Sequence, residues 1–170
     1  MGISTKKLVL TALFTALVTI TTMLIRIPLP LGYFNLGDAF IFLAVFILGP
    51  LLGTIATGIG STVADLIGFI AYAPGTLIIK TLMSLTASLI YKFIKNRTTK
   101  IVLAEISAGI IATLMMALGY FIYETILFTT VAIAIVNVPY NLLQGGIGIV
   151  FSVVSMRILN KIKILDKLQK

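Results

Sequence analysis

The sequence contains no cysteine and no histidine, and only five of its 170 residues are acidic. The absence of cysteine excludes disulfides and thiolate chemistry, and the absence of histidine removes the commonest general base and metal ligand. No segment has the Gly-x-x-x-x-Gly-Lys-Ser/Thr pattern of a phosphate-binding loop, so any ATP hydrolysis must come from other subunits. These absences argue against an enzyme, and the sequence predicts neither a metal site nor a cofactor.

Hydrophobic residues dominate the chain. They make up 59% of it, charged residues make up 11%, and the mean hydropathy is +1.17. The apolar runs are too long and too numerous for the core of a soluble domain of this length. We therefore expect one integral membrane domain over 1–170, an all-α bundle of six transmembrane helices of roughly 20 residues each. The first hydrophobic segment follows Lys6 and Lys7 but lacks a small-residue cleavage site, so it is interpreted as a retained helix.

Breaks in the hydrophobic sequence separate six predicted helices, at 7–25, 38–52, 54–71, 76–94, 101–123 and 131–160. Prolines in the segment 26–32 end the first helix, because proline donates no backbone hydrogen bond and disfavours helix in the residue before it. Gly49 and Pro50 predict a tight turn between the second and third helices. Pro139 falls inside the last run, so we expect that helix to be broken or to begin with a separate turn.

Basic residues gather on one side of this predicted bundle. If both ends of the chain lie on one side, all thirteen lysines and arginines except Arg26 and Lys80 share that side. The positive-inside rule makes it cytoplasmic and places the connections 26–37, 71–75 and 124–130 outside. Topology and attraction to anionic lipid then explain the net charge of +8 without a nucleic acid partner.

Polar residues within the apolar spans are expected to converge in the outer half of the bundle. Intramembrane ionisable residues indicate a functional site, because a charge in hydrocarbon is costly. Asp65 and Lys80 are interpreted as an ion pair that either belongs to this site or only pins two helices together. Asp38 has the alternative role of a helix cap, and Glu124 that of a solvated interfacial residue. The predicted substrate-binding residues are Tyr33, Asn35, Asp38, Asp65, Lys80, Glu124, Asn137, Tyr140, Asn141 and Gln144.

Aromatic and small residues add two further predictions. Most aromatic residues near the outer face are expected to form an interfacial belt, whereas Tyr33 and Phe34 lie in a loop and are candidates for a lid. Ala12 and Ala16 form a small-xxx-small pair in the first helix, and a longer stripe of this kind runs over 56–68 in the third. Such stripes either pack helices within the monomer or dock another membrane protein.

In their order along the chain, these features resemble the substrate-binding S components of energy-coupling-factor (ECF) transporters, the small six-helix vitamin-capture subunits of prokaryotes. The residues that carry the resemblance are Ala12 and Ala16, Asn35 to Asp38, Leu48 to Pro50 with Gly53, Asp65, Ala73 to Thr76, Ile79 and Lys80. They look most like the branch that carries riboflavin, hydroxymethylpyrimidine and pyridoxine-like compounds. The resemblance implies the riboflavin-carrier-like fold in the plasma membrane.

The resemblance also implies a function. The S component would capture a vitamin or vitamin precursor from outside, dock through Ala12 and Ala16 on a membrane-embedded coupling (T) subunit driven by two ATPases, and release its substrate by toppling. A stand-alone ion-coupled secondary transporter or small multidrug exporter is the alternative, with Asp65 or Glu124 as the proton-coupling carboxylate. The clustering of acids near the outer face and the lack of an internal repeat count against it.

Overall fold

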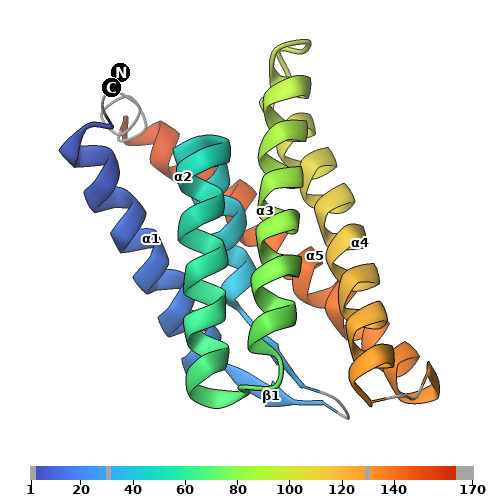
Figure 1. The fold of residues 1–170 in the computed structure, drawn as a ribbon. Helices are drawn as coiled ribbons and strands as arrows, with labels where there is room; N and C mark the ends of the chain where they lie inside the picture. Colours follow the sequence, from blue (N-terminus) through green and yellow to red (C-terminus); the bar gives the residue numbers. More distant parts are fainter. Residues whose placement is uncertain (1–2, 30–31, 129–130, 164–170) are drawn as a thin grey trace.

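The computed structural model describes residues 3–29, 32–128 and 131–163. Within these residues, five helices and one short hairpin follow one another along the chain (Figure 1): α1 (Thr5–Leu24), β1 (Arg26–Pro28), β2 (Tyr33–Asn35), α2 (Gly37–Gly68), α3 (Ala73–Lys95), α4 (Ile101–Phe128) and α5 (Val131–Lys161). All five helices are long and apolar enough to cross a membrane. The prediction of a polytopic helical bundle is therefore confirmed in outline.

The predicted count of six helices is not confirmed, because the spans expected at 38–52 and 54–71 form the single assigned helix α2. That helix is interrupted at Gly49, whose φ of 78° and ψ of −172° are not helical, and Pro50 follows. We call the segment 37–48 the first arm of α2 and the segment 50–68 its second arm. The predicted turn is thus present, but it lies within one assigned helix.

The two arms of α2 fold back on each other. An added Cβ at Gly53 would lie 2.8 Å from the Cα of Val45, so the backbones approach as closely as only glycine permits. Asp38 and Asp65 would be about 40 Å apart along a straight helix. Instead they contact Lys80 and Thr76, which are one turn apart on α3. The fold-back thus brings two carboxylates to one end of the bundle.

A β-hairpin occupies most of the segment that the sequence predicted as a loop. β1 and β2 are antiparallel, with Arg26 opposite Asn35 and Pro28 opposite Tyr33. Pro28 is tolerated because it lies on a two-stranded ribbon, where one side of each strand needs no ladder partner. The all-α prediction is corrected to this extent.

The last helix is continuous, contrary to the expected break. α5 runs from Val131 to Lys161 with Pro139 inside it. Proline removes one backbone hydrogen bond and crowds the carbonyl of Ile135. Transmembrane helices tolerate this loss because neighbouring helices and local adjustments satisfy the freed groups.

The described basic residues lie mainly at one end of the bundle. α1 begins, α3 ends and α5 ends at this end, whereas the hairpin lies at the other (Figure 1). Of the predicted basic fringe, Lys167 and Lys170 lie outside the described residues. The grouping of helix ends agrees with the arrangement expected from the charges.

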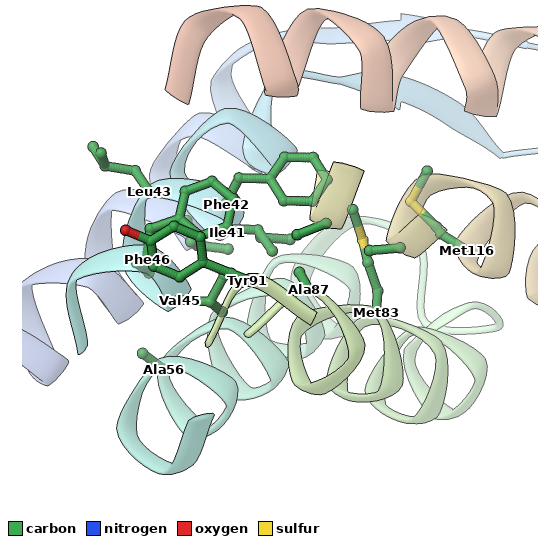
Figure 2. Close-up of a cluster of buried hydrophobic side chains, with 14 of the residues drawn as sticks. Ile41, Phe42, Leu43, Val45, Phe46, Ala56, Met83, Ala87, Tyr91 and Met116 are labelled. Carbon is green, nitrogen blue, oxygen red and sulfur yellow. The ribbon is translucent and has the colours of Figure 1, made fainter. Parts of the chain in front are cut away.

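A core of large side chains joins the first arm of α2 to α3 and α4. Ile41, Phe42, Met83 and Met116 are fully buried there (Figure 2). Elsewhere the helices approach through small residues: an added Cβ at Gly60 would lie 2.7 Å from the carbonyl oxygen of Thr15. Close van der Waals packing of this kind holds membrane helices together, because lipid is as apolar as the core. The stripe over 56–68 therefore packs α2 against α1 inside the molecule at Gly60.

Candidate functional site

A polar cavity lies beneath the hairpin, at the end of the bundle opposite the basic residues. The cavity is narrow: its volume is about 30 Å³ for the centre of a water-sized molecule, and about 380 Å³ when all space between its atoms and the open mouth are included. Hydrophobic residues contribute little to its wall, which consists of Leu29, Gly32, Tyr33, Asn35, Asp65, Tyr72, Thr76, Tyr120, Glu124, Asn137, Asn141 and Gln144. Seven of these were predicted from the sequence: Tyr33, Asn35, Asp65, Glu124, Asn137, Asn141 and Gln144.

Asp65 is held by hydroxyl groups, not by the predicted ion pair. Tyr33 donates a hydrogen bond to its Oδ1, and the Thr76 hydroxyl donates to its Oδ2 at 2.5 Å. Thr76 in turn contacts the hydroxyl of Tyr120 at 3.0 Å. The expected pairing of Asp65 with Lys80 is wrong, because the fold-back of α2 places a different carboxylate beside the lysine.

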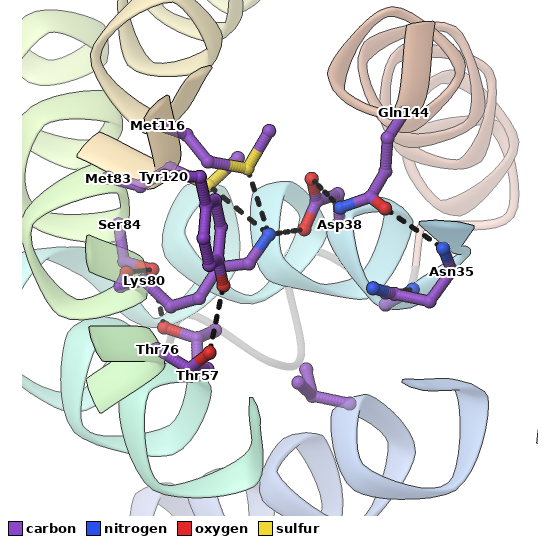
Figure 3. Close-up of polar contacts among 12 residues, drawn as sticks. Asn35, Asp38, Thr57, Thr76, Lys80, Met83, Ser84, Met116, Tyr120 and Gln144 are labelled. Atoms are coloured by element: carbon purple, nitrogen blue, oxygen red, sulfur yellow. Dashed lines mark hydrogen bonds and ion pairs between the residues drawn. The ribbon is translucent and has the colours of Figure 1, made fainter. Parts of the chain in front are cut away.

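Lys80 forms its ion pair with Asp38, and neither residue lines the polar cavity (Figure 3). Both are almost completely buried. The Nζ of Lys80 also lies 2.9 Å from the Sδ of Met116. The pair therefore lies outside the cavity wall, and Asp38 contacts the wall through Gln144.

Gln144 connects this ion pair to the hairpin. Its Nε2 donates to Asp38 Oδ2 at 2.9 Å, and its Oε1 accepts the backbone N–H of Asn35 at 2.9 Å. The Asn35 Oδ1 accepts the backbone N–H of Gly37 at 2.8 Å. One buried network thus fixes the amide orientation of a cavity residue and the start of α2 (Figure 3).

Glu124 and Asn141 supply cavity groups that have hydrogen-bonding capacity to spare. Glu124 Oε1 accepts from Asn137 Nδ2 at 3.1 Å and from the Tyr72 hydroxyl at 3.3 Å. Its Oε2 is buried and has no hydrogen-bond partner among the described residues. Asn141 lines the cavity and makes no side-chain hydrogen bond within the described part of the chain. A buried polar atom normally has a partner, so the Oε2 of Glu124 points to a ligand.

Arg26 fastens the hairpin over the cavity. Its guanidinium donates to the carbonyl oxygens of Thr22 at 3.1 Å and Ala64 at 2.8 Å, and it lies 4.7 Å from the centre of the Tyr33 ring. Burial raises the pKa of the Tyr33 hydroxyl, and the neighbouring Asp65 adds to this effect. Tyr33 therefore stays protonated as a donor. No role for Arg26 could be predicted from the sequence, since a single cation at a helix end is usual in membrane proteins.

Tyr140 lies apart from the cavity, although it was predicted to line it. Its exposed fraction is 41%, and it is absent from the wall. At 100° per residue, Tyr140 lies at the edge of the face shared by Asn137, Asn141 and Gln144, and its side chain falls outside the wall. Tyr72 and Tyr120, expected only as belt residues, do line the cavity. The described residues hold no cluster of three or more acidic side chains that could bind a metal ion.

Comparison with known proteins identifies the family. The sequence model of the family described as ECF-type riboflavin transporter, S component, matches residues 2–161. The chain belongs to this family of ECF transporter S components. An uncharacterised protein of Pyrococcus woesei is 43% identical over 108 residues, which cover 61% of this chain and 68% of the relative.

A solved structure supports the fold of this S component. It was described as "Structure and mechanism of the S component of a bacterial ECF transporter", and it matches with a TM-score of 0.68 and 24% sequence identity. The match covers 93% of this chain and 98% of the other. At this identity the likeness bears on the fold alone. This chain is thus a membrane-embedded, substrate-binding transport subunit by family and has the S-component fold by structure.

The predicted docking residues of this S component lie on its outer surface. α1 packs against the bundle through Phe14, Val18 and Thr22, which are its buried residues. Ala12 and Ala16 are exposed on another face of the helix. The small-xxx-small pair of α1 is therefore unused by packing within the monomer.

Proposed function

We propose that this S component captures a small polar heteroaromatic molecule, a vitamin or vitamin precursor, from outside the cell. Hydroxymethylpyrimidine and pyridoxine-like compounds are the favoured substrates, and riboflavin is the third candidate. The observation that carries the proposal is the polar cavity, in whose wall, among the described residues, the buried Oε2 of Glu124 has no partner and the amide of Asn141 makes no side-chain hydrogen bond. The family of the chain supports a transport role for this cavity.

The chemistry of the wall suits a flat nitrogen heterocycle. Carboxylate oxygens accept from ring N–H, amino or hydroxyl groups, and amide side chains both donate and accept. Tyr33, Tyr72 and Tyr120 offer ring faces next to these groups. A few placed polar groups among aromatic rings are typical of small-molecule sites. An inorganic ion would leave the ring faces unused, and a lipid tail would leave the polar groups unused.

The cavity faces outward in the proposed topology. The lysine-rich ends of α1, α3 and α5 lie opposite the hairpin, and the positive-inside rule assigns the basic end to the cytoplasm. Both termini are then cytoplasmic, and substrate enters beneath the hairpin from the outside.

Uptake would require partner subunits. The sequence has no nucleotide-binding motif, so the energy must come from elsewhere. We expect a membrane-embedded coupling subunit to pack its helices on Ala12 and Ala16, where small side chains permit close backbone approach. Two ATPase subunits would drive that complex.

Removing the Asn141 amide should weaken substrate binding, and this experiment tests the proposed function. The wild-type protein, purified in detergent, should retain a heteroaromatic compound that mass spectrometry identifies. Asn141→Ala should bind this compound up to about a hundredfold more weakly, because the lost amide leaves a buried ligand group unsatisfied at a cost of about 1 to 3 kcal/mol.

Tyr140→Ala is the matched control, because it alters the adjacent residue of α5 outside the cavity. It should bind the compound as the wild type does. Equal affinity in wild type and Asn141→Ala, or an equal loss in both variants, would place the binding site elsewhere.

Substrate should order the hairpin. Tyr33 and Arg26 hold it over the cavity, and a lid that excludes water strengthens the polar contacts beneath it. Hydrogen exchange over 26–37 should therefore slow by at least tenfold when substrate is added. Tyr33→Phe, which removes the donor to Asp65, should speed exchange in the substrate-free protein. Identical exchange with and without substrate would argue against a lid.

A further inference from the structure

A second polar cavity lies at the basic end of the bundle, between the Gly49–Pro50 bend of α2 and the last turns of α3. Its volume is about 590 Å³, open mouth included. One face of α3 contributes Ser88, Tyr91, Lys92 and Lys95, at the relative positions 0, 3, 4 and 7 that align along a helix. We call this space the lysine cavity. The polar cavity beneath the hairpin shares none of its residues.

Two hydroxyl groups in the lysine cavity, those of Ser88 and Tyr91, lack hydrogen bonds within the described part of the chain. Ser88 is 1% exposed and Tyr91 is 6% exposed, yet neither side chain makes a hydrogen bond within the described part of the chain. Tyr91 is held by the ring of Phe46, with ring centres 4.6 Å apart. Both residues line the cavity, and a hydroxyl group there can donate to an anionic oxygen.

The charges around the lysine cavity favour an anion. Lys92 and Lys95 bring two ammonium groups, and the second arm of α2 begins at its rim. A helix N-terminus attracts negative charge. Gly49 brings no side chain to cap it, and an added Cβ there would meet nothing within 4 Å.

Opposing negative charge near the lysine cavity is limited. Lys95 interacts electrostatically with Glu105 of α4, but Glu105 is already paired, since its Oε1 accepts from Arg157 at 2.5 Å. The carbonyl ends of α3 and of the first arm of α2 also point to this region, and lysines near a helix C-terminus offset such dipoles.

We propose that the lysine cavity binds a phosphate group, and that its source is the headgroup of an anionic phospholipid. The two ammonium groups and two hydroxyls supply donors for phosphate oxygens. Phe46, Ile47 and Leu48 line the same cavity, so an apolar surface lies beside the donors. This mixture fits an amphiphile at the membrane surface better than free phosphate, and basic pockets between helices bind such headgroups. The proposal goes beyond substrate capture and does not depend on it.

Native mass spectrometry of the full chain in detergent tests the proposal. With added phosphatidylglycerol we expect one tightly retained lipid per protein, and with phosphatidylcholine none. Lys92→Gln/Lys95→Gln should weaken retention about 30-fold, because each lysine near the surface contributes roughly fivefold. Ser88→Ala, which changes no charge, should also weaken it severalfold. Lys6→Gln/Lys7→Gln removes two charges at the same end of the bundle and should leave retention unchanged.

Several results would overturn the lipid assignment. An equal loss of phosphatidylglycerol in Lys92→Gln/Lys95→Gln and Lys6→Gln/Lys7→Gln would mean that the lipid is attracted by the overall charge of this end and not by the cavity. Retention of phosphatidylcholine as tight as that of phosphatidylglycerol would mean that the cavity binds only the apolar part of the lipid. Displacement of the lipid by millimolar inorganic phosphate or glycerol phosphate would mean that the cavity binds phosphate, but that the natural ligand is a soluble phosphate compound and not a phospholipid. If no phosphate compound binds and Lys92→Gln/Lys95→Gln instead loses co-purifying coupling subunits, the cavity receives an acidic protein segment and the proposal is wrong.

Discussion

Ala12→Trp or Ala16→Trp should abolish ATP-driven uptake of substrate while leaving the affinity for substrate within about twofold. Both alanines are exposed on α1, away from the buried residues that pack this helix on the bundle. Two helices that meet through small residues approach closely, and one large side chain at the contact prevents this approach. No residue of α1 lines the polar cavity. The two variants should therefore lose transport without losing substrate binding.

The measurement compares two assays on the same variants: substrate binding in detergent, and uptake in vesicles that contain the coupling subunit and both ATPases. Leu13→Trp is the control, because Leu13 is 51% exposed but points about a quarter turn away from the alanine pair. It should transport normally. Normal uptake by Ala12→Trp and Ala16→Trp, or loss of binding in either, would contradict the docking proposal.

The same assay tests the alternative of a stand-alone carrier. The wild-type chain alone, in vesicles with a proton or sodium gradient, should not accumulate substrate. Accumulation without partners would replace the subunit proposal by an ion-coupled transporter, in which a buried carboxylate such as Asp65 carries the coupling ion.

The positions of the helices could be predicted because each depends on local sequence. Hydrophobic length sets the spans, and the pair Gly49–Pro50 marks the bend in α2. The hairpin was missed for a physical reason: its strands have three residues each, too few for an alternating pattern, and prolines argue against a strand. At Pro139 a break was predicted where α5 is continuous, because tertiary packing overrides the local cost of a proline in a helix.

The set of polar residues was predictable, but their pairing was not. Composition indicates which side chains need partners, and Asp65, Glu124, Asn137, Asn141 and Gln144 do meet in one cavity. Which carboxylate meets Lys80 depends on how far the two arms of α2 fold back, and no local pattern encodes that. Thr76 was not predicted to line the cavity, and Tyr120 was predicted only as one of the aromatic residues near the outer face, since a tyrosine or threonine in a membrane helix has several ordinary roles.

Lys80→Met should destabilise the protein by about 3 to 5 kcal/mol, because it leaves the carboxylate of Asp38 buried without its counter-charge. Both members of the pair are almost inaccessible to solvent. Methionine matches the length of lysine and would lie next to Met83 and Met116, so a cavity contributes little to the loss. Equilibrium unfolding in mixed detergent micelles measures the effect. Lys6→Met, at an exposed position of α1, should change stability by no more than about 0.5 kcal/mol.

The double variant Asp38→Asn/Lys80→Met isolates the cost of the unpaired charge. Asparagine at position 38 can still accept from Gln144 Nε2, which donates to Asp38 Oδ2 at 2.9 Å in the wild type. With both charges removed, most of the lost stability should return, since neutral replacements of buried ion pairs are often tolerated. Lys80→Met should also weaken substrate binding, because Asp38 positions Gln144 in the cavity wall, and this affinity should return in the double variant, where the asparagine at position 38 again holds Gln144 against Asn35. A double variant no more stable than Lys80→Met would mean that the lysine acts through its packing, and that the ion pair does not position the cavity wall.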